Sequence, residues 1–241
     1  MPQCDCVQTP FIGSEAVATG RVRKHQLRSR FTAMFPDVYT DKSGDDLTIY
    51  HRATAAWLWS RRGGVIARLT ASKLHGAKYI DDCLPIELAW SGRRPPPGIV
   101  THKVQLAADD VVVRGGLPFT SVERTAFDIG RRGTLDESIA RLDALGNATG
   151  FTADTARQFA LGHRGARGMR QLVEALDLYD PGAESPPETA LRLLLIRAGY
   201  PRPATQIPVR SADGKRRQAA DRRSPRSEER RVGKECLRLC R

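Results

Sequence analysis

The chain has 241 residues, 40% of them hydrophobic, which is enough to bury a core and excludes a disordered protein. No run of 18 apolar residues occurs, which excludes a membrane-spanning helix, and the first residues lack a signal-peptide pattern. We therefore expect a cytoplasmic protein without a membrane partner. The net charge of +12 is typical of nucleic-acid binding, but residues 215–241 carry eleven Lys/Arg and only four Asp/Glu.

The first elements predict a small DNA-binding fold. Ser14 can cap a short helix that Gly20 ends, and a second helix fits residues 22–31. Residues 35–39 and 47–51 are predicted to be the two strands of a ribbon, the second because its apolar residues alternate. Two helices followed by a ribbon are the outline of a winged helix, so we predict a winged-helix-like DNA-binding module at 1–52.

The second predicted helix and the turn before it are rich in positive charge. In a winged helix, this helix enters the major groove of DNA. The alternative is that these side chains are the solvated face of an amphipathic helix, and the sequence leaves both interpretations open. The candidate DNA-binding residues are Arg21, Arg23, Lys24, Arg28 and Arg30.

Residues 53–182 are predicted to form a mixed α/β domain with a small sheet and a helical end. Short helices at 53–60 and 70–76 precede β-like stretches in 86–121, and a Thr120–Glu123 capping box opens the first of four further helices. Within that helix, Arg124 and Asp128 are four residues apart and are predicted to form an exposed ion pair. His75 lacks a catalytic partner nearby and is predicted to be structural.

The final native-looking segment is predicted at 183–221. Ser185 and Glu188 frame a capping pattern, with proline in the first turn, so a helix should begin there. A strand at 205–210 and a turn into a second strand follow. The whole chain is thus predicted to have an α/β (α+β) fold.

Residues 222–241 are predicted to be a non-native, disordered tail. The stretch RSEERRVGKEC, residues 226–236, can be read back into codons that match a common sequencing-library adapter in one frame. The alternative is a genuine basic tail that binds nucleic acid. If the tail is foreign to the protein, the domain before it is truncated.

Several stretches resemble known bacterial families. PFIGSEAVATG, TASKLHG and TSVERTAFDIGRR resemble AbiEi-type antitoxins, in which a winged helix precedes a larger α/β domain. SPPETALRLLLIRAGYPRPATQIPVRSADGKRRQAAD resembles the beginning of a very-short-patch-repair-like endonuclease domain of the PD-(D/E)xK superfamily. Together the two resemblances cover about residues 10–221.

The endonuclease resemblance implies a restriction-endonuclease-like α/β domain that uses Mg²⁺. Carboxylates would hold the ion, which polarises the phosphate and lowers the pKa of the attacking water. Glu188 and Asp221 match the first two acidic positions, both catalytic and metal-binding in an intact parent. The strand that should carry a third carboxylate is missing, so we expect no bound Mg²⁺ and no cleavage by this chain, and whether the parent is an enzyme stays open.

Two functions follow from these resemblances. The first is a DNA-associated bacterial protein, a truncated member of a family that pairs an antitoxin-like DNA-binding region with a Mg²⁺-dependent endonuclease-like domain. The alternative is a non-enzymatic AbiEi-type antitoxin that represses transcription of its own toxin–antitoxin system. The expected partners are DNA and a cognate toxin.

Overall fold

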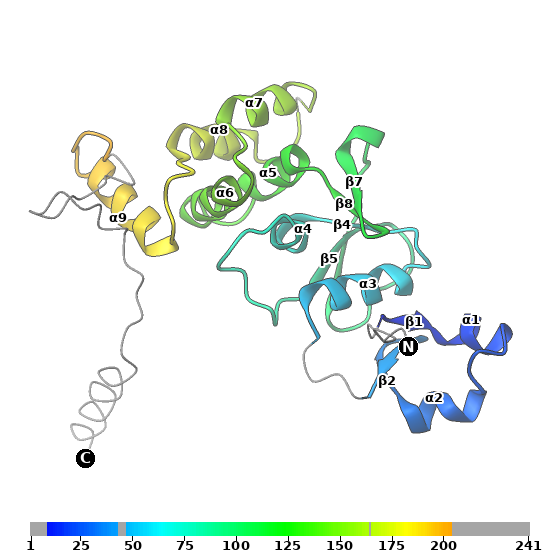
Figure 1. Cartoon of the computed structure of the whole chain (residues 1–241). Helices are drawn as coiled ribbons and strands as arrows, with labels where there is room; N and C mark the ends of the chain where they lie inside the picture. Colours follow the sequence, from blue (N-terminus) through cyan, green and yellow to red (C-terminus); the bar gives the residue numbers. More distant parts are fainter. Residues whose placement is uncertain (1–8, 43–46, 164, 204–241) are drawn as a thin grey trace, which may run out of the picture. The chain divides into compact units, whose positions relative to one another are not determined.

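The computed structural model describes residues 9–42, 47–163 and 165–203, which all belong to one compact unit, Met1–Pro203 (Figure 1). Their fold is α+β, as predicted, with two open sheets and a set of helices. None of the described helices has the length and apolar composition needed to cross a membrane. Asp221, the strands predicted after Pro203 and the predicted tail lie outside the described residues.

The N-terminal module consists of two short helices and a three-stranded antiparallel sheet with the order β1-β3-β2. Its buried centre is small and comprises Ala16, Val22 and Leu27, with aromatic rings packed around it. The elements in chain order are β1 (Phe11–Ile12), α1 (Gly13–Ala18), α2 (Lys24–Arg30), β2 (Phe31–Phe35) and β3 (Val38–Asp41).

The predicted ribbon was wrong in its strands, although a two-stranded hairpin does follow α2. The hairpin is made of β2 and β3, and Asp37 turns between them with a φ of 64°. Residues 47–51, predicted as a strand, instead lead into helix α3 (Ile49–Trp59). The Thr48 side chain accepts a hydrogen bond from the His51 N–H and so forms the N-cap of this helix. The alternating polarity of five residues, on which the strand prediction rested, is too short a pattern to outweigh this cap.

A five-stranded mixed sheet forms the middle of the unit, with the order β6-β5-β4-β8-β7. The pairs β4–β8 and β5–β6 are parallel, and the other two pairs are antiparallel. Helix α3 packs its alanines against Ile66, Leu88 and Phe119 of this sheet. The remaining elements are β4 (Val65–Ile66), α4 (Arg68–Leu74), β5 (Ile86–Ala89), β6 (Ile99–His102), the 3-10 turn η1 (Ala108–Asp110), β7 (Val111–Arg114) and β8 (Leu117–Thr120).

In the described residues, five helices follow the sheet and share a second core. Phe127 of α5 meets Leu142 of α6 and Leu172 of α8 in this core, and all three side chains are fully buried. The N-cap of α5 is Ser121, one residue after the predicted Thr120, because the Ser121 hydroxyl accepts the Arg124 N–H. The helices are α5 (Val122–Gly130), α6 (Leu135–Thr149), α7 (Ala153–Leu161), α8 (Met169–Leu178) and α9 (Pro186–Arg197).

The Arg124–Asp128 pair is buried, so the prediction of an exposed pair was wrong. Arg124 is 3% exposed and Asp128 2% exposed. Arg124 donates from Nε to Asp128 at 2.8 Å and from a terminal nitrogen to Asp110 at 2.9 Å, while Arg131 donates to Asp128 at 2.7 Å. The pair is enclosed because α5 lies among α4, α6, α7 and α8, which helix periodicity alone could not reveal.

The predicted division into 1–52, 53–182, 183–221 and 222–241 stays a prediction. Its first boundary falls inside α3, and α9, beyond the second, is joined to α6 by a buried ion pair between Arg192 and Asp143 at 2.6 Å. Elements on either side of both predicted boundaries are therefore closely packed.

Candidate nucleic-acid interface

Helix α2 is short but is held at both ends. At its start the Gln26 side chain accepts the Arg23 backbone N–H at 2.8 Å. At its end the Lys42 ammonium donates to the carbonyls of Arg28 and Ser29, at 3.3 and 2.8 Å. Leu27 fixes the inner face in the small core. A seven-residue helix with these anchors presents its outer side chains in a defined orientation.

All five candidate DNA-binding residues are exposed. Lys24 and Arg28 lie one turn apart and share a face of α2. Arg23 stands directly before the helix and Arg30 at its last position, while the Arg21 guanidinium lies over the Phe11 ring, 5.0 Å from its centroid. Within the described part of the chain, none of the five forms an ion pair with a carboxylate, and α2 itself contains no acidic residue.

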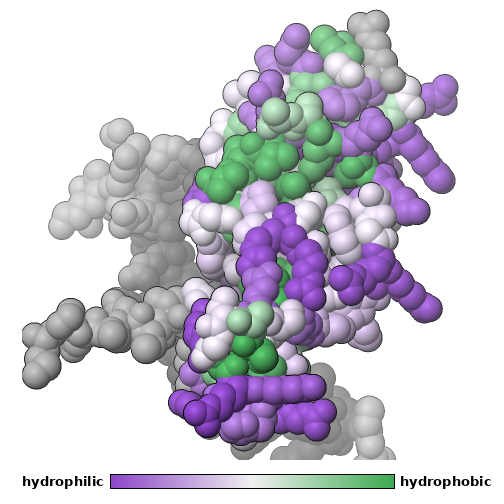
Figure 2. Space-filling model, turned by 90° about the vertical axis from the view of Figure 1, so that its right-hand side faces the viewer, coloured by the Kyte–Doolittle hydropathy of each residue, from purple (hydrophilic) through white to green (hydrophobic). Residues whose placement is uncertain are grey.

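The hydrophilic character of this region is visible on the surface. On the face drawn in Figure 2, hydrophilic side chains gather at the lower end, the level at which α1 and α2 lie in Figure 1. Because the cations of α2 are exposed and lack carboxylate partners in the described residues, they can meet an anionic surface without first breaking an ion pair.

Two arginines after α3 attach the module to the rest of the unit, and we call these contacts the Arg61–Arg62 latch. Arg61 donates to Asp37 at 2.8 Å, and Arg62 makes a two-pronged bond with the Glu15 carboxylate, both arms at 2.7 Å. Both arginines have positive φ values, 58° and 65°, a conformation that L residues rarely adopt. The latch fixes the position of α1, and with it α2.

The latch also changes the acidity of its carboxyl groups. The hydrogen bonds from Arg62 hold the pKa of Glu15 below its usual value. Burial alone would raise the pKa of Asp37, but hydrogen bonds from the Ser14 hydroxyl and N–H, together with Arg61, outweigh burial and lower it. Both carboxyl groups are therefore ionised at neutral pH and keep the latch closed.

Sequence reasoning missed both Lys42 and the latch. Lys42 follows β3 and belongs to the polar stretch TDKSGDD, residues 40–46, whose composition favours a turn. Arg61 and Arg62 precede Gly63 and Gly64 in a pattern that reads as a helix break. Nothing local in either stretch points to a partner, because those partners lie at least 13 residues away in the chain.

Glu188 is exposed in the first turn of α9, and its carboxylate accepts two hydrogen bonds from the residues just before the helix. The Ser185 hydroxyl donates to one oxygen and the Glu184 N–H donates to the other, each at 2.9 Å. Over the described ranges, no three His, Cys, Asp or Glu residues come close enough to hold a metal ion. Asp221, the predicted partner of Glu188, lies outside these ranges, so its role as a metal ligand stays a prediction.

His75 takes a structural position. Its ring Nε2 is 2.8 Å from the Thr120 carbonyl, and the ring meets Phe119 edge-on. Burial lowers the pKa of His75, although the bond to Thr120 opposes this, so the ring is neutral at pH 7. This geometry agrees with the structural role predicted from sequence.

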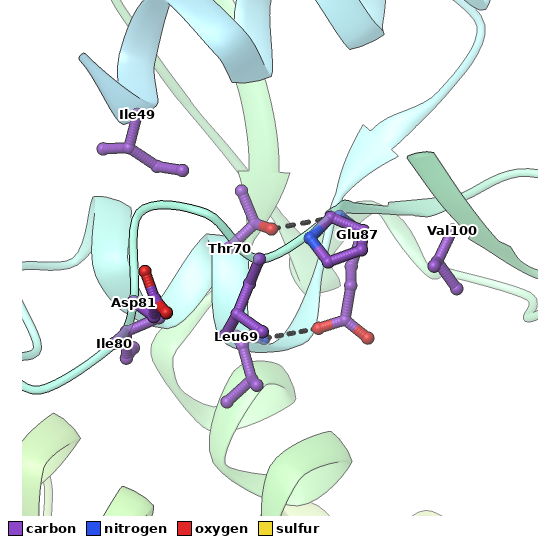
Figure 3. Close-up of a pocket in the computed structure, with 9 residues that line it drawn as sticks. Ile49, Leu69, Thr70, Ile80, Asp81, Glu87 and Val100 are labelled. Carbon is purple, nitrogen blue, oxygen red and sulfur yellow. Dashed lines mark hydrogen bonds between the residues drawn. The ribbon is translucent and has the colours of Figure 1, made fainter. Parts of the chain in front are cut away.

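A separate pocket of about 170 Å³ opens beside the start of α4 (Figure 3). Its walls are mainly apolar, with Ile49, Leu69 and Val100 among them. The Glu87 carboxylate faces it but is already engaged, because one oxygen accepts the Leu69 N–H at 3.0 Å and the other lies 2.9 Å from His102 Nε2. The pocket has room for a small apolar molecule and offers few free polar groups to select one.

The fold and this surface define an α+β protein in which two short N-terminal helices, the second of them basic and exposed, precede a β-hairpin. The sequence matches no protein-family model and no curated protein. Among solved structures, the chain is similar to the crystal structure of the RV2827C protein from Mycobacterium tuberculosis, with 14% identity, a TM-score of 0.48, and coverage of 83% of this chain and 79% of that chain. This likeness is too distant to assign a fold family or a function.

Proposed function

We propose that this protein is a DNA-binding regulator of the AbiEi antitoxin-like kind and that α2 is its reading helix. The observation that carries the proposal is the set of exposed cations on and beside α2, which have no carboxylate partner within the described residues. In a helix–turn–helix, the second helix lies in the major groove with its first residues against the base edges. Arg23, Lys24 and Arg28 are placed for that role.

The other two cations suit the DNA backbone. Arg21 lies in the turn before α2 and Arg30 at its last position, so both stand at the ends of the helix and off the face shared by Lys24 and Arg28. Lysine and arginine at such flanking positions contact phosphates, which position a protein on DNA without reading its sequence. The proposal therefore assigns Arg21 and Arg30 to affinity, and Arg23, Lys24 and Arg28 to sequence selection.

A binding measurement tests the assignment. Selection from a random duplex library gives a preferred DNA site, and fluorescence anisotropy then measures affinity at several salt concentrations. In the variant Lys24→Ala/Arg28→Ala we expect affinity for the preferred site to fall by about 10- to 100-fold and affinity for unrelated duplex DNA to fall much less, because base contacts set the sequence preference. The variant Lys103→Ala/Arg170→Ala is the matched control, because it removes two exposed cations elsewhere and should change both quantities little.

Equal losses of affinity in the two variants would mean that α2 contributes no more than any other positively charged surface. That result would contradict the proposal. So would unchanged binding by Lys24→Ala/Arg28→Ala in protein that circular dichroism shows to be folded. A cognate toxin remains a hypothesis from the resemblance, and a nucleotidyltransferase-like toxin gene beside this one would favour it.

The truncated-endonuclease hypothesis rests on sequence resemblance alone. No described contact adds to it, since both oxygens of the Glu188 carboxylate accept hydrogen bonds from Glu184 and Ser185, just before α9. It expects that the intact parent needs Mg²⁺, Glu188 and Asp221 for DNA cleavage. Cleavage by a parent protein that carries Glu188→Gln would contradict it, since the amide keeps the size of the side chain but removes the charge that suits a Mg²⁺ ligand.

A further inference from the structure

Strand β7 forms one edge of the five-stranded sheet. Its neighbour is β8 on one side, and in the described residues no strand pairs with the other side (Figure 1). Such an edge exposes a row of backbone N–H and C=O groups that can pair with another strand.

The hairpin turn shows which groups of β7 point outward. Gly115 and Gly116 have φ values of 57° and 79°, the two positive angles of the tight turn that suits a two-residue hairpin. In such a hairpin the backbone groups of Arg114 and Val112 exchange hydrogen bonds with β8, so every second residue of β7 faces β8. Asp110 is the next residue in this series, and its carbonyl accepts the Ser121 N–H at 2.8 Å. The N–H and C=O groups of Val111 and Val113 therefore face away from β8.

Apart from its short length of four residues, β7 carries little of the usual protection of an edge strand. Edge strands are normally blunted by lysine, proline or a bulge, but β7 reads VVVR and pairs with β8 in regular register. Val113 is 67% exposed and Val112 38% exposed. The one charged residue, Arg114, bends back over the Phe119 ring and donates to the Leu74 carbonyl at 3.1 Å, so it does not guard the edge.

We propose that β7 pairs antiparallel with β7 of a second copy of this chain, about a two-fold axis at Val112. Val111 of one copy then lies opposite Val113 of the other, and each pair exchanges both backbone hydrogen bonds. Val111 and Val113 lie at equal distances from the axis on both copies. The outward N–H and C=O groups of one copy therefore meet the matching C=O and N–H groups of the other.

Charge also favours a second copy as the occupant. The chain enters β7 from exposed Asp109 and ends it at exposed Arg114. In the antiparallel pair, the acidic end of each strand lies beside the basic end of the other. The Arg114 guanidinium is bonded to the Leu74 carbonyl but has no carboxylate partner in the described residues, so the two ends attract each other at a distance without forming a direct ion pair. A pair of four-residue strands is a small interface, so we expect a dissociation constant of roughly 1 to 100 μM.

Sedimentation equilibrium of the full chain at about 100 μM, without DNA, tests the association; its outcome is independent of the proposed DNA binding. We expect about half or more of the wild-type chains to be in dimers and Val112→Lys to be monomeric, because two lysines would face each other at the axis. The control is Val173→Lys, which changes another exposed valine, on α8, and should remain dimeric. A monomeric wild type, or a dimer that persists in folded Val112→Lys, overturns the proposal.

Cysteine cross-linking tests the register and decides the matter if Val112→Lys fails to fold. In a background where Cys4, Cys6, Cys83, Cys236 and Cys240 are replaced by serine, Val112→Cys places two thiols across the axis at a non-hydrogen-bonded pair, where side chains are closest. Val113→Cys places its thiols two residues out of register. We expect rapid disulfide dimer formation for Val112→Cys only. Equal or faster cross-linking of Val113→Cys overturns the proposed pairing.

Discussion

The N-terminal module and the helical region α5–α9 use arginine in opposite ways. In the helical region, Arg124, Arg131 and Arg192 are nearly inaccessible to solvent, and each is bonded to one or more aspartates. In the module, the arginines on and beside α2 are exposed and lack a carboxylate partner in the described residues. The same side chain therefore holds helices together in one region and is available to an outside anion in the other.

This difference follows from the cost of burying charge. A buried guanidinium must be paired and hydrogen-bonded, because an isolated charge in the interior is strongly unfavourable. An exposed one keeps its hydration and needs no partner. Pairing thus separates arginines that belong to the architecture from those that can serve recognition. Substitutions at Asp143 and Glu15 can sharpen or break this distinction, and one at Gly146 compares the packing of the helical region.

The largest effect is expected from Asp143→Ala in the helical region. Asp143 accepts bonds from Arg192 at 2.6 Å, from the Thr189 hydroxyl at 2.8 Å and from the Asp180 N–H at 2.7 Å. Its loss leaves the buried Arg192 with only the more distant Asp180, at 4.0 Å, as an aspartate partner, so the free energy of unfolding should fall by about 3 to 5 kcal/mol. Urea unfolding measures this change.

The matched control for this prediction is Asp154→Ala. Asp154 pairs with Arg157, but its side chain is 91% exposed, so its removal should cost less than about 1 kcal/mol. If the two substitutions had equal effects, burial would not be what separates the two kinds of arginine.

A middle-sized effect is expected from Gly146→Ala, which tests how tightly the helical region is packed. A Cβ at Gly146 would lie 2.0 Å from the Tyr179 hydroxyl oxygen, and that hydroxyl is held in place by donating to the Phe151 carbonyl at 2.6 Å. Overpacking should lower the free energy of unfolding by about 1 to 3 kcal/mol, although alanine suits a helix better than glycine. Thermal unfolding checks this.

Gly162→Ala provides the comparison for Gly146→Ala. The new methyl group would lie 3.5 Å from its nearest neighbour, the Phe159 carbonyl, so stability should stay the same or rise slightly. If Gly162→Ala lowered the free energy of unfolding strongly and Gly146→Ala did not, the close approach of the new methyl group to Tyr179 would not be what limits packing at Gly146.

The smallest effect is expected from Glu15→Gln in the latch of the N-terminal module. Glu15 and Arg62 are each 46% exposed, so their pair should contribute less than about 1 kcal/mol. The pKa of Glu15 is lowered in the folded protein, so this contribution is present above the ordinary value of 4.5 and is lost as pH falls through the folded-state pKa. The stability difference between wild type and Glu15→Gln should therefore vanish in acid.

Thermal unfolding over a pH series measures this difference, and Glu174→Gln, at an exposed glutamate on α8, is the control. A gap that persists unchanged at about pH 2, where carboxyl groups are protonated, would assign the effect to something other than the charged latch.

The sequence by itself determined the local features of this protein. Capping residues and helical spacing located α1, α2 and the helices from α5 to α9 to within a few residues, because a helix closes its hydrogen bonds within four residues along the chain. The charges of Lys24 and Arg28 indicated that both side chains lie on the outside of α2, because lysine and arginine are rarely buried without a partner.

Only the tertiary structure decided which segments meet. The order β6-β5-β4-β8-β7, the hairpin partner of β2, the burial of Arg124 and Asp128, and the contact of Lys42 with the end of α2 all depend on residues brought together by packing. Periodicity shows that a residue can face a neighbour but not which neighbour will be there. Pairing and burial are settled by the fold as a whole, because they are gained only when distant segments leave water together.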